Sequence, residues 1–255
     1  AMRARTTHTP RCGCKLGHIG LGDGLFRRAR LVGPPQGTAQ VVEEIVDAAP
    51  LFSRLPKQVF QGERVVLAAK DDGSKKRCLE MQVAGWNLAV NLVLRHEALE
   101  RLRSERGLSA GDLVAHLQGW ALMPPSKMSF FRTAIEALFA GDHITAIHIL
   151  APHIEDVLRR TVRQAEIPAT AFNADGSQSE QLLGELLRKT KVQIFLGPRL
   201  QQTFLYVLAD EMGLNLRNRA AHGMIEANEC TWMAAETLLW SLLALTVFRP
   251  TKVNC

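Results

Sequence analysis

The polar side chains best suited to chemistry gather in one short stretch near the C-terminus, Arg217 to Gly223, which reads RNRAAHG. If this stretch is helical, Asn218 and His222 are four residues apart, about 40° around the axis, and share a face. Arg217 and His222 are five residues apart, about 140° around the axis, and would grip a phosphate from two sides. Arginine binds phosphate and offsets developing charge, and imidazole takes and returns a proton near neutral pH.

The same residues also have a purely structural interpretation. Gly223 is a typical helix stop, which would place His222 in the last turn, where the helix dipole favours a positively charged imidazole. Asn215 is of the residue type that caps a helix start. Arg217 and Arg219 would then be solvated, and His222 would cap backbone carbonyl groups. Because an arginine and a histidine at this spacing arise readily by chance, spacing alone favours the structural interpretation.

The elements that must position these residues are helices, because apolar residues recur at helical spacing from Leu79 onward. In residues 142–166 the pattern also places Glu155 and Arg159 four residues apart, where they are expected to form an ion pair. Two stretches begin with a capping pattern, Ser109 with Asp112 and Ser177 with Glu180. The expected helices cover residues 79–103, 109–120, 126–142, 142–166, 181–189, 199–212 and 228–248. The chain is therefore predicted to be all-α.

The stripe of residues 79–103 is predicted to face a core. Its members are Val83, Trp86, Val90, Val93, Leu94 and Leu99.

The 255-residue chain carries its net charge of +6 in one region. Residues 1–40 hold seven basic residues and one acid, whereas the rest of the chain holds equal numbers of basic and acidic side chains. We therefore expect residues 1–40 to be a basic, largely irregular tail that attracts phosphates without specificity. A mostly helical segment is expected over 41–125, with a short strand or hairpin in 58–76. Pro124-Pro125 then precedes a helical domain over 126–255.

Other functional classes lack their sequence signatures. The five cysteines are odd in number and unpatterned, which is unlike a disulfide framework and fits a reduced, cytoplasmic compartment. Cys12, Cys14 and His18 make only a weak metal-binding pattern, so we expect no metal and no cofactor. The longest apolar run, residues 232–248, carries Glu236 and is short for a membrane span. We expect it to form a buried helix and expect no membrane insertion.

The stretch Arg217–His222 resembles the R-x4–6-H motif of the HEPN superfamily, a group of helical domains found in prokaryotic toxins, defence systems and RNA-processing enzymes. The resemblance extends over GDHITAIHILAPHIEDVLR (141–159), DGSQSEQLLGELL (175–187) and LADEMGLNLRNRAAHG (208–223), in the same order and spacing. These blocks are similar to a HEPN-like domain of unknown function that is also found in the endoplasmic reticulum membrane-associated RNA degradation protein of eukaryotes. The resemblance covers about residues 130–248, and it implies a HEPN-like helical bundle in the C-terminal half, preceded by a smaller helical segment.

Active members of this superfamily are metal-independent endoribonucleases that dimerise and bring two motifs into one cleft. The resemblance implies that Arg217 binds the scissile phosphate, that His222 transfers the proton, and that Asn218 matches the polar residue that often follows the arginine. It also gives Glu155 and Arg159 a role in orienting Arg217, beside their expected ion pair. The reaction would be attack of a ribose 2′-OH on its own phosphate, leaving a cyclic phosphate and a free 5′-OH.

We therefore expect a homodimeric endoribonuclease that acts on RNA, with a toxin or defence effector as one form of this function. Two alternatives stay open. One is a non-catalytic HEPN module that binds RNA, a nucleotide or a protein partner, and the other is a structural helical domain within a larger protein. A regulatory protein or further domains of a longer chain are the other partners that this interpretation allows.

Overall fold

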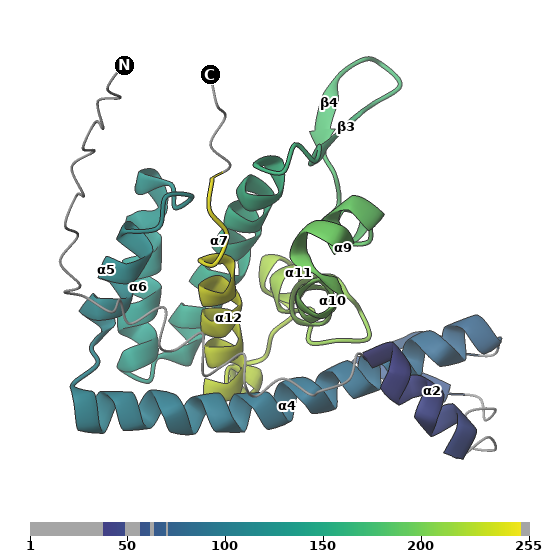
Figure 1. Cartoon of the computed structure of the whole chain (residues 1–255), viewed down its shortest axis with the longest axis horizontal. Helices are drawn as coiled ribbons and strands as arrows, with labels where there is room; N and C mark the ends of the chain where they lie inside the picture. Colours follow the sequence, from purple (N-terminus) through teal and green to yellow (C-terminus); the bar gives the residue numbers. More distant parts are fainter. Residues whose placement is uncertain (1–37, 49–56, 62–63, 70, 251–255) are drawn as a thin grey trace, which may run out of the picture.

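The helices expected from Leu79 onward are present in the structure, a computed structural model that describes residues 38–48, 57–61, 64–69 and 71–250 (Figure 1). In these residues the fold is all-α, as predicted, with two short antiparallel hairpins, β1–β2 and β3–β4. Cys12, Cys14, His18 and all but the last three residues of the basic tail lie outside the described residues.

Along the chain, one helix comes first, followed by a β-hairpin, a group of helices, a second β-hairpin and a second group of helices. They are α2 (Thr38–Ala48), β1 (Lys57–Gln61), β2 (Arg64–Ala69), α4 (Asp72–Arg106), α5 (Ala110–Gln118), the 3-10 helix η1 (Pro125–Lys127), α6 (Met128–Phe139), α7 (His143–Arg163), β3 (Thr170–Phe172), β4 (Gln178–Glu180), α8 (Leu183–Leu187), α9 (Thr190–Leu196), α10 (Pro198–Phe204), the π-helix η2 (Leu205–Ala209), α11 (Leu216–Ala221), the 3-10 helix η3 (Ala227–Glu229) and α12 (Trp232–Leu245).

Helix α7 lies at the centre of the bundle, where it packs against α6, α11 and α12. It begins at Asp142, whose carboxylate accepts a hydrogen bond from the Thr145 N–H (3.0 Å). Its inner face is apolar and buried, whereas Ile144 is half exposed in the first turn. The buried apolar residues of this face include Ile147, Leu150, Ile154, Val157 and Leu158.

Helix α4 lies along the lower edge of the molecule in the view of Figure 1, with the other bundle helices above it. It extends beyond both ends of the predicted stretch 79–103, from a cap at Asp71 to Gly107, whose positive φ of 65° ends the helix. Only part of the predicted stripe is buried. Val83 and Leu99 face packed neighbours, but Trp86, Val90, Val93 and Leu94 are exposed, so the prediction was wrong for these four residues.

The contact between α4 and α12 includes polar groups. The His96 Nδ1 and the Glu236 Oε1 lie 2.8 Å apart, and the His96 ring stacks on Trp232. Burial raises the pKa of Glu236, and the hydrogen bond with His96 offsets part of this effect. The largely buried helix α12 covers most of the apolar run 232–248 but begins at Trp232 and ends at Leu245, inside the expected bounds 228–248. No helix in the described ranges combines the length and apolarity needed to cross a membrane.

One core of buried residues extends from Leu92 on α4 to Leu245 on α12, and helices on both sides of Pro124-Pro125 contribute to it. Helix α5 begins with the predicted capping box, in which Asp112 N–H donates to the Ser109 Oγ (3.3 Å) and Ser109 N–H donates to the Asp112 Oδ2 (2.8 Å). A smaller core of Val42, Leu79 and Val83 joins α2 to α4.

The chain reaches the RNRAAH stretch through a turn that Asp210 anchors. The helix expected over 199–212 ends earlier, because α10 passes into η2, which stops at Ala209. The Asp210 carboxylate, 1% exposed, accepts hydrogen bonds from Arg77 on α4 (2.8 Å), Arg188 (2.7 Å) and the Met212 N–H (3.0 Å). Burial by itself raises the pKa of Asp210, but these donors outweigh burial and hold the pKa below its ordinary value of 3.8.

Asp210→Asn is expected to destabilise the fold at pH 7 by about 2–3 kcal/mol, because two guanidinium groups lose their shared counter-charge. Since the folded state lowers the pKa, the stability from this charge is present above 3.8 and is lost as the pH falls through the folded value. The difference from the parent should therefore narrow below pH 3.8 in urea unfolding. Asp72→Asn, at an exposed aspartate on α4, is the control. A difference that widens on acidification would contradict this role.

Candidate functional site

The turn that leads into α11 is held by a close approach of two backbone segments. A Cβ on Gly213 would lie 2.2 Å from the backbone oxygen of Tyr206 in η2, so a larger residue does not fit there without a shift of the backbone. The Asn215 N–H then donates to the same Tyr206 oxygen (3.3 Å). These contacts fix the direction in which the chain enters α11.

Asn215 occupies the N-cap position of α11, as expected, but its side chain makes no capping hydrogen bond. Its φ of 49° lies in the left-handed region, which asparagine tolerates better than most residues. A capping side chain needs an extended backbone, so the predicted cap was wrong for this geometric reason. Instead the Asn215 Oδ1 accepts a hydrogen bond from the Asn218 Nδ2 (2.8 Å). Asn215 therefore holds another residue of the candidate motif.

The C-terminus of α11 is a Schellman turn. The Met224 N–H donates to the Arg219 oxygen (2.8 Å), and the Gly223 N–H donates to the Ala220 oxygen (3.3 Å). Gly223 has a φ of 64°, as the predicted helix stop requires. His222 is consequently the C-cap residue, one position beyond the last turn in which it was expected.

Arg219 holds the loop that follows α11. Its guanidinium group donates to the Met224 oxygen (3.0 Å) and to the Glu229 carboxylate. The backbone N–H of Glu226 and, to a smaller extent, Arg219 hold the pKa of Glu229 below its ordinary value. The side chain of Arg219 is mostly buried, so the interpretation of Arg219 as solvated was wrong.

Arg217 is held from two sides. Its Nε donates to the Glu155 Oε2, and its Nη1 donates to the Asn218 Oδ1 (2.9 Å). In the part of the chain that the structure describes, the Arg217 Nη2 has no hydrogen-bond partner, and 31% of the side chain is exposed. The Asn218 side-chain amide accepts a hydrogen bond from Arg217 through its oxygen and donates one to Asn215 through its nitrogen. Asn218 therefore links Arg217 to Asn215.

Glu155 and Arg159 form the predicted ion pair on α7. The Glu155 Oε1 accepts from the Arg159 Nε (2.9 Å) and Nη2 (2.6 Å), and both side chains are 9% exposed. Because the other oxygen of Glu155 accepts from Arg217, one carboxylate joins α7 to α11. The structure therefore brings together the three charged residues that the family resemblance assigned to one site.

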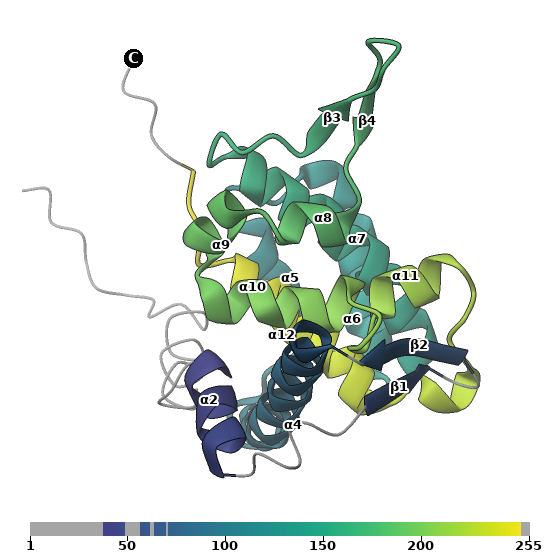
Figure 2. The same ribbon diagram turned by 90° about the vertical axis from the view of Figure 1, so that its right-hand side faces the viewer.

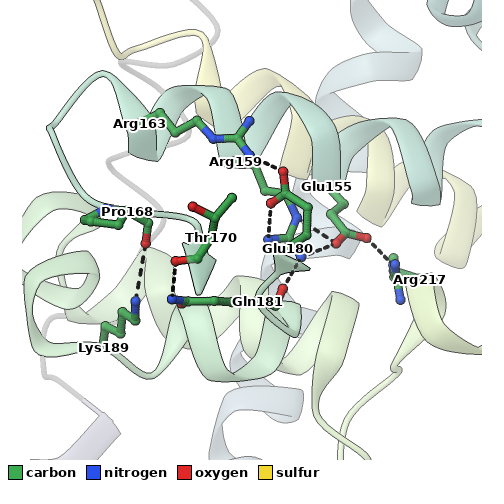
Figure 3. A network of polar contacts seen from close by, with 9 residues as sticks. All are labelled: Glu155, Arg159, Arg163, Pro168, Thr170, Glu180, Gln181, Lys189 and Arg217. Carbon is green, nitrogen blue, oxygen red and sulfur yellow. Dashed lines mark hydrogen bonds and ion pairs between the residues drawn. The ribbon is translucent and has the colours of Figure 1, made fainter. Parts of the chain in front are cut away.

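The sequence interpretation missed Glu180. Ser177 and Glu180 do not cap a helix, because Ser177 lies in the turn of the β3–β4 hairpin and Glu180 ends β4. The Glu180 carboxylate accepts from the Arg159 Nη1 (3.3 Å) and from Arg163 (Figure 3). Helix α8 begins instead at Leu183, without a side-chain cap. The hairpin projects beyond the bundle, and α11 lies beside α7 (Figure 2).

His222 is exposed, and its imidazole has no hydrogen-bond partner among the described residues. Arg217 lies in the first turn of α11 and His222 at its C-cap, which are separated by about 7.5 Å along the axis. Asn218 was expected to point between these two residues, but its side chain instead hydrogen-bonds to Arg217 and Asn215. Among the described residues, no three His, Cys, Asp or Glu side chains are grouped so that they could hold a metal ion.

Comparisons with known proteins identify no relative of this chain. No family model, no curated protein and no solved structure matches the chain. The resemblance to the HEPN superfamily therefore depends on the motif blocks quoted above.

Proposed function

We propose that the chain is a metal-independent endoribonuclease of HEPN type that works as a homodimer. One observation carries the proposal. Arg217 is fixed by a buried carboxylate while its Nη2 keeps no partner among the described residues, and the exposed His222 ends the same short helix. An anchored arginine can hold and stabilise a reacting phosphate, and an accessible imidazole can transfer protons, so the two groups support metal-free cleavage of a phosphodiester.

Arg217 would bind the scissile phosphate. Its hydrogen bonds to Glu155 and Asn218 restrict the plane of the guanidinium group and leave Nη2 for a phosphate oxygen. An arginine that is already ordered loses less entropy when it binds, and its charge stabilises the additional negative charge of the transition state. Glu155, Asn218 and Asn215 act here as positioning residues, and Arg159 fixes Glu155.

His222 would move the protons. One imidazole takes the proton from the ribose 2′-OH as this oxygen attacks the phosphorus. The bond from phosphorus to the 5′ oxygen then breaks, and a protonated imidazole gives this oxygen a proton. The products are a 2′,3′-cyclic phosphate and a 5′-OH. Because one imidazole is poorly suited to be base and acid at once, we place a second His222, from the partner copy, in the same cleft.

The alternative function is a non-catalytic module that binds RNA, a nucleotide or a protein partner. One contact favours it. Asn218 uses both ends of its amide on Arg217 and Asn215, so one residue of the expected catalytic set is not available to a substrate. Under either function we propose a cytoplasmic location, on the basis of the unpatterned cysteines. A toxin or defence effector is the form of the catalytic proposal that the family resemblance favours.

His222→Ala should lower RNA cleavage by about 10²–10⁴-fold, because a proton-transfer group is lost. Arg217→Ala should lower cleavage by about 10²–10³-fold, because the phosphate loses an oriented charge. Single-turnover cleavage of a panel of structured and unstructured RNAs measures both rates, and melting temperatures should change little. The products should carry cyclic phosphate ends, and the parent should remain active in EDTA.

His148→Ala and Arg160→Ala are matched controls, since both side chains are exposed on α7. They should cleave at the parental rate. Equal cleavage by His222→Ala and the parent would remove His222 from the reaction. Activity that vanishes with EDTA would contradict the metal-free reaction. A folded parent that binds RNA but cleaves none of the panel would support the binding module.

The RNRAAH stretch should lie at the interface of a homodimer. Met224, two residues after His222, is 47% exposed, and a charge placed there should separate the copies. Met224→Glu is therefore expected to raise the dissociation constant of the dimer in analytical ultracentrifugation. Ile194→Glu is the control, because Ile194 is exposed on α9, on the opposite side of the bundle from α11 in Figure 2. A parent that is monomeric at micromolar concentration would contradict the prediction.

A further inference from the structure

Five charged side chains form a chain of alternating sign between the β3–β4 hairpin and the candidate site (Figure 3). In order they are Arg163, Glu180, Arg159, Glu155 and Arg217. Arg159 and Glu155 are buried, Glu180 is about half exposed, and the arginines at the two ends are partly exposed. Consecutive ion pairs therefore connect Glu180 at the hairpin to Arg217, so removal of the Glu180 charge can affect Arg217.

Arg159 is the member that joins the hairpin to the site. Its guanidinium group donates to Glu155 on one side, and to Glu180 (3.3 Å) and the Gln181 oxygen (2.6 Å) on the other. Glu180 supplies the second negative charge for a guanidinium group that is mostly removed from water. Without Glu180, Arg159 has Glu155 as its only carboxylate partner in the described chain.

Loss of Glu180 would change how Glu155 interacts with its two arginines. In the intact site the Glu155 Oε1 accepts hydrogen bonds from Arg159, and the Oε2 accepts one from Arg217. A buried guanidinium group that has lost one carboxylate draws more strongly on the other, because the interior screens charge weakly. The bond to the partly exposed Arg217 is the one that weakens, since water can replace that partner.

We propose that Glu180 is a positioning residue for Arg217 and acts through Arg159 and Glu155. The inference rests on the proposed function of Arg217 as the group that binds phosphate. It extends the site to the hairpin, from which the sequence predicted no functional residue.

The role of Glu180 differs from simple attachment of the hairpin. The base of the hairpin is also held by the Gln181 N–H on the Ala169 oxygen (3.0 Å) and by the Gln181 Nε2 on the Thr170 oxygen (2.8 Å). The two strands pair through their backbones as well. None of these bonds uses the Glu180 side chain, so a variant at Glu180 should retain the hairpin.

The test compares Glu180→Ala with two matched variants. Glu185→Ala removes the same charge from an exposed position on α8, and the Glu185 side chain has no ion pair or hydrogen bond with any of the described residues. Arg163→Ala breaks the other ion pair of Glu180 and leaves Glu180 to Arg159. The readout is the rate at which the Arg217 Nε–H exchanges with water, measured by NMR and assigned with Arg217→Lys.

Exchange of the Arg217 Nε–H should be about tenfold faster in Glu180→Ala, which corresponds to the loss of one charge-assisted hydrogen bond. It should be unchanged in Glu185→Ala and Arg163→Ala. Unchanged exchange in Glu180→Ala would overturn the proposal. Equally fast exchange in Arg163→Ala would also overturn it, because a general loosening of the hairpin would then be the cause.

RNA cleavage separates this inference from the proposed function. If the parent cleaves RNA, Glu180→Ala should lower kcat/KM about tenfold, because a less well positioned Arg217 binds and stabilises the reacting phosphate less well. An unchanged kcat/KM in Glu180→Ala would overturn the positioning role. If the parent cleaves no RNA, faster Nε–H exchange in Glu180→Ala still supports the positioning of Arg217, and only the endoribonuclease proposal fails.

Discussion

A single buried carboxylate, that of Glu155, holds two guanidinium groups from different elements, and the arrangement of the candidate site depends on it. A charge this far from water is stable only when it is paired, so α7 must bring partners to it. Arg159 comes from the same helix, and Arg217 comes from α11 after the chain has passed through the β3–β4 hairpin, the helices α8, α9 and α10 and the π-helix η2. The ion pair between Arg217 and Glu155 therefore joins α11 to α7.

The parts of the site that lie within one element could be predicted from the sequence. Glu155 and Arg159 are four residues apart on α7, and Gly223 ends α11, so local spacing is sufficient for both features. Glu180 shows where local spacing fails. Ser109 and Asp112 share the same serine-to-acid spacing as Ser177 and Glu180, yet only the first pair caps a helix. Gly176, with a φ of 82°, turns the chain into a hairpin, and strand pairing then decides where Glu180 lies.

Periodicity also shows that a helix has an apolar face without showing what covers it. On α4 the bundle packs against the face that carries Leu92 and Leu99, whereas Trp86 and Val90 lie on another. The helix expected over 199–212 is present but ends at Ala209, for a related reason. Its sequence is helical throughout, but the chain widens into a π-helix and stops where Asp210 meets arginines from distant segments. Long-range contacts of this kind leave no local pattern.

The left-handed backbone of Asn215 narrows the range of residues that this position can accept. Glycine, asparagine and aspartate reach that conformation most readily, and most other side chains would strain it. Of the three, glycine has no side chain with which to meet the Asn218 amide. A library of random substitutions across residues 214–223 would therefore separate two requirements at one position. Glycine would preserve the path of the chain and lose the link to Arg217, while aspartate would keep an oxygen for that link.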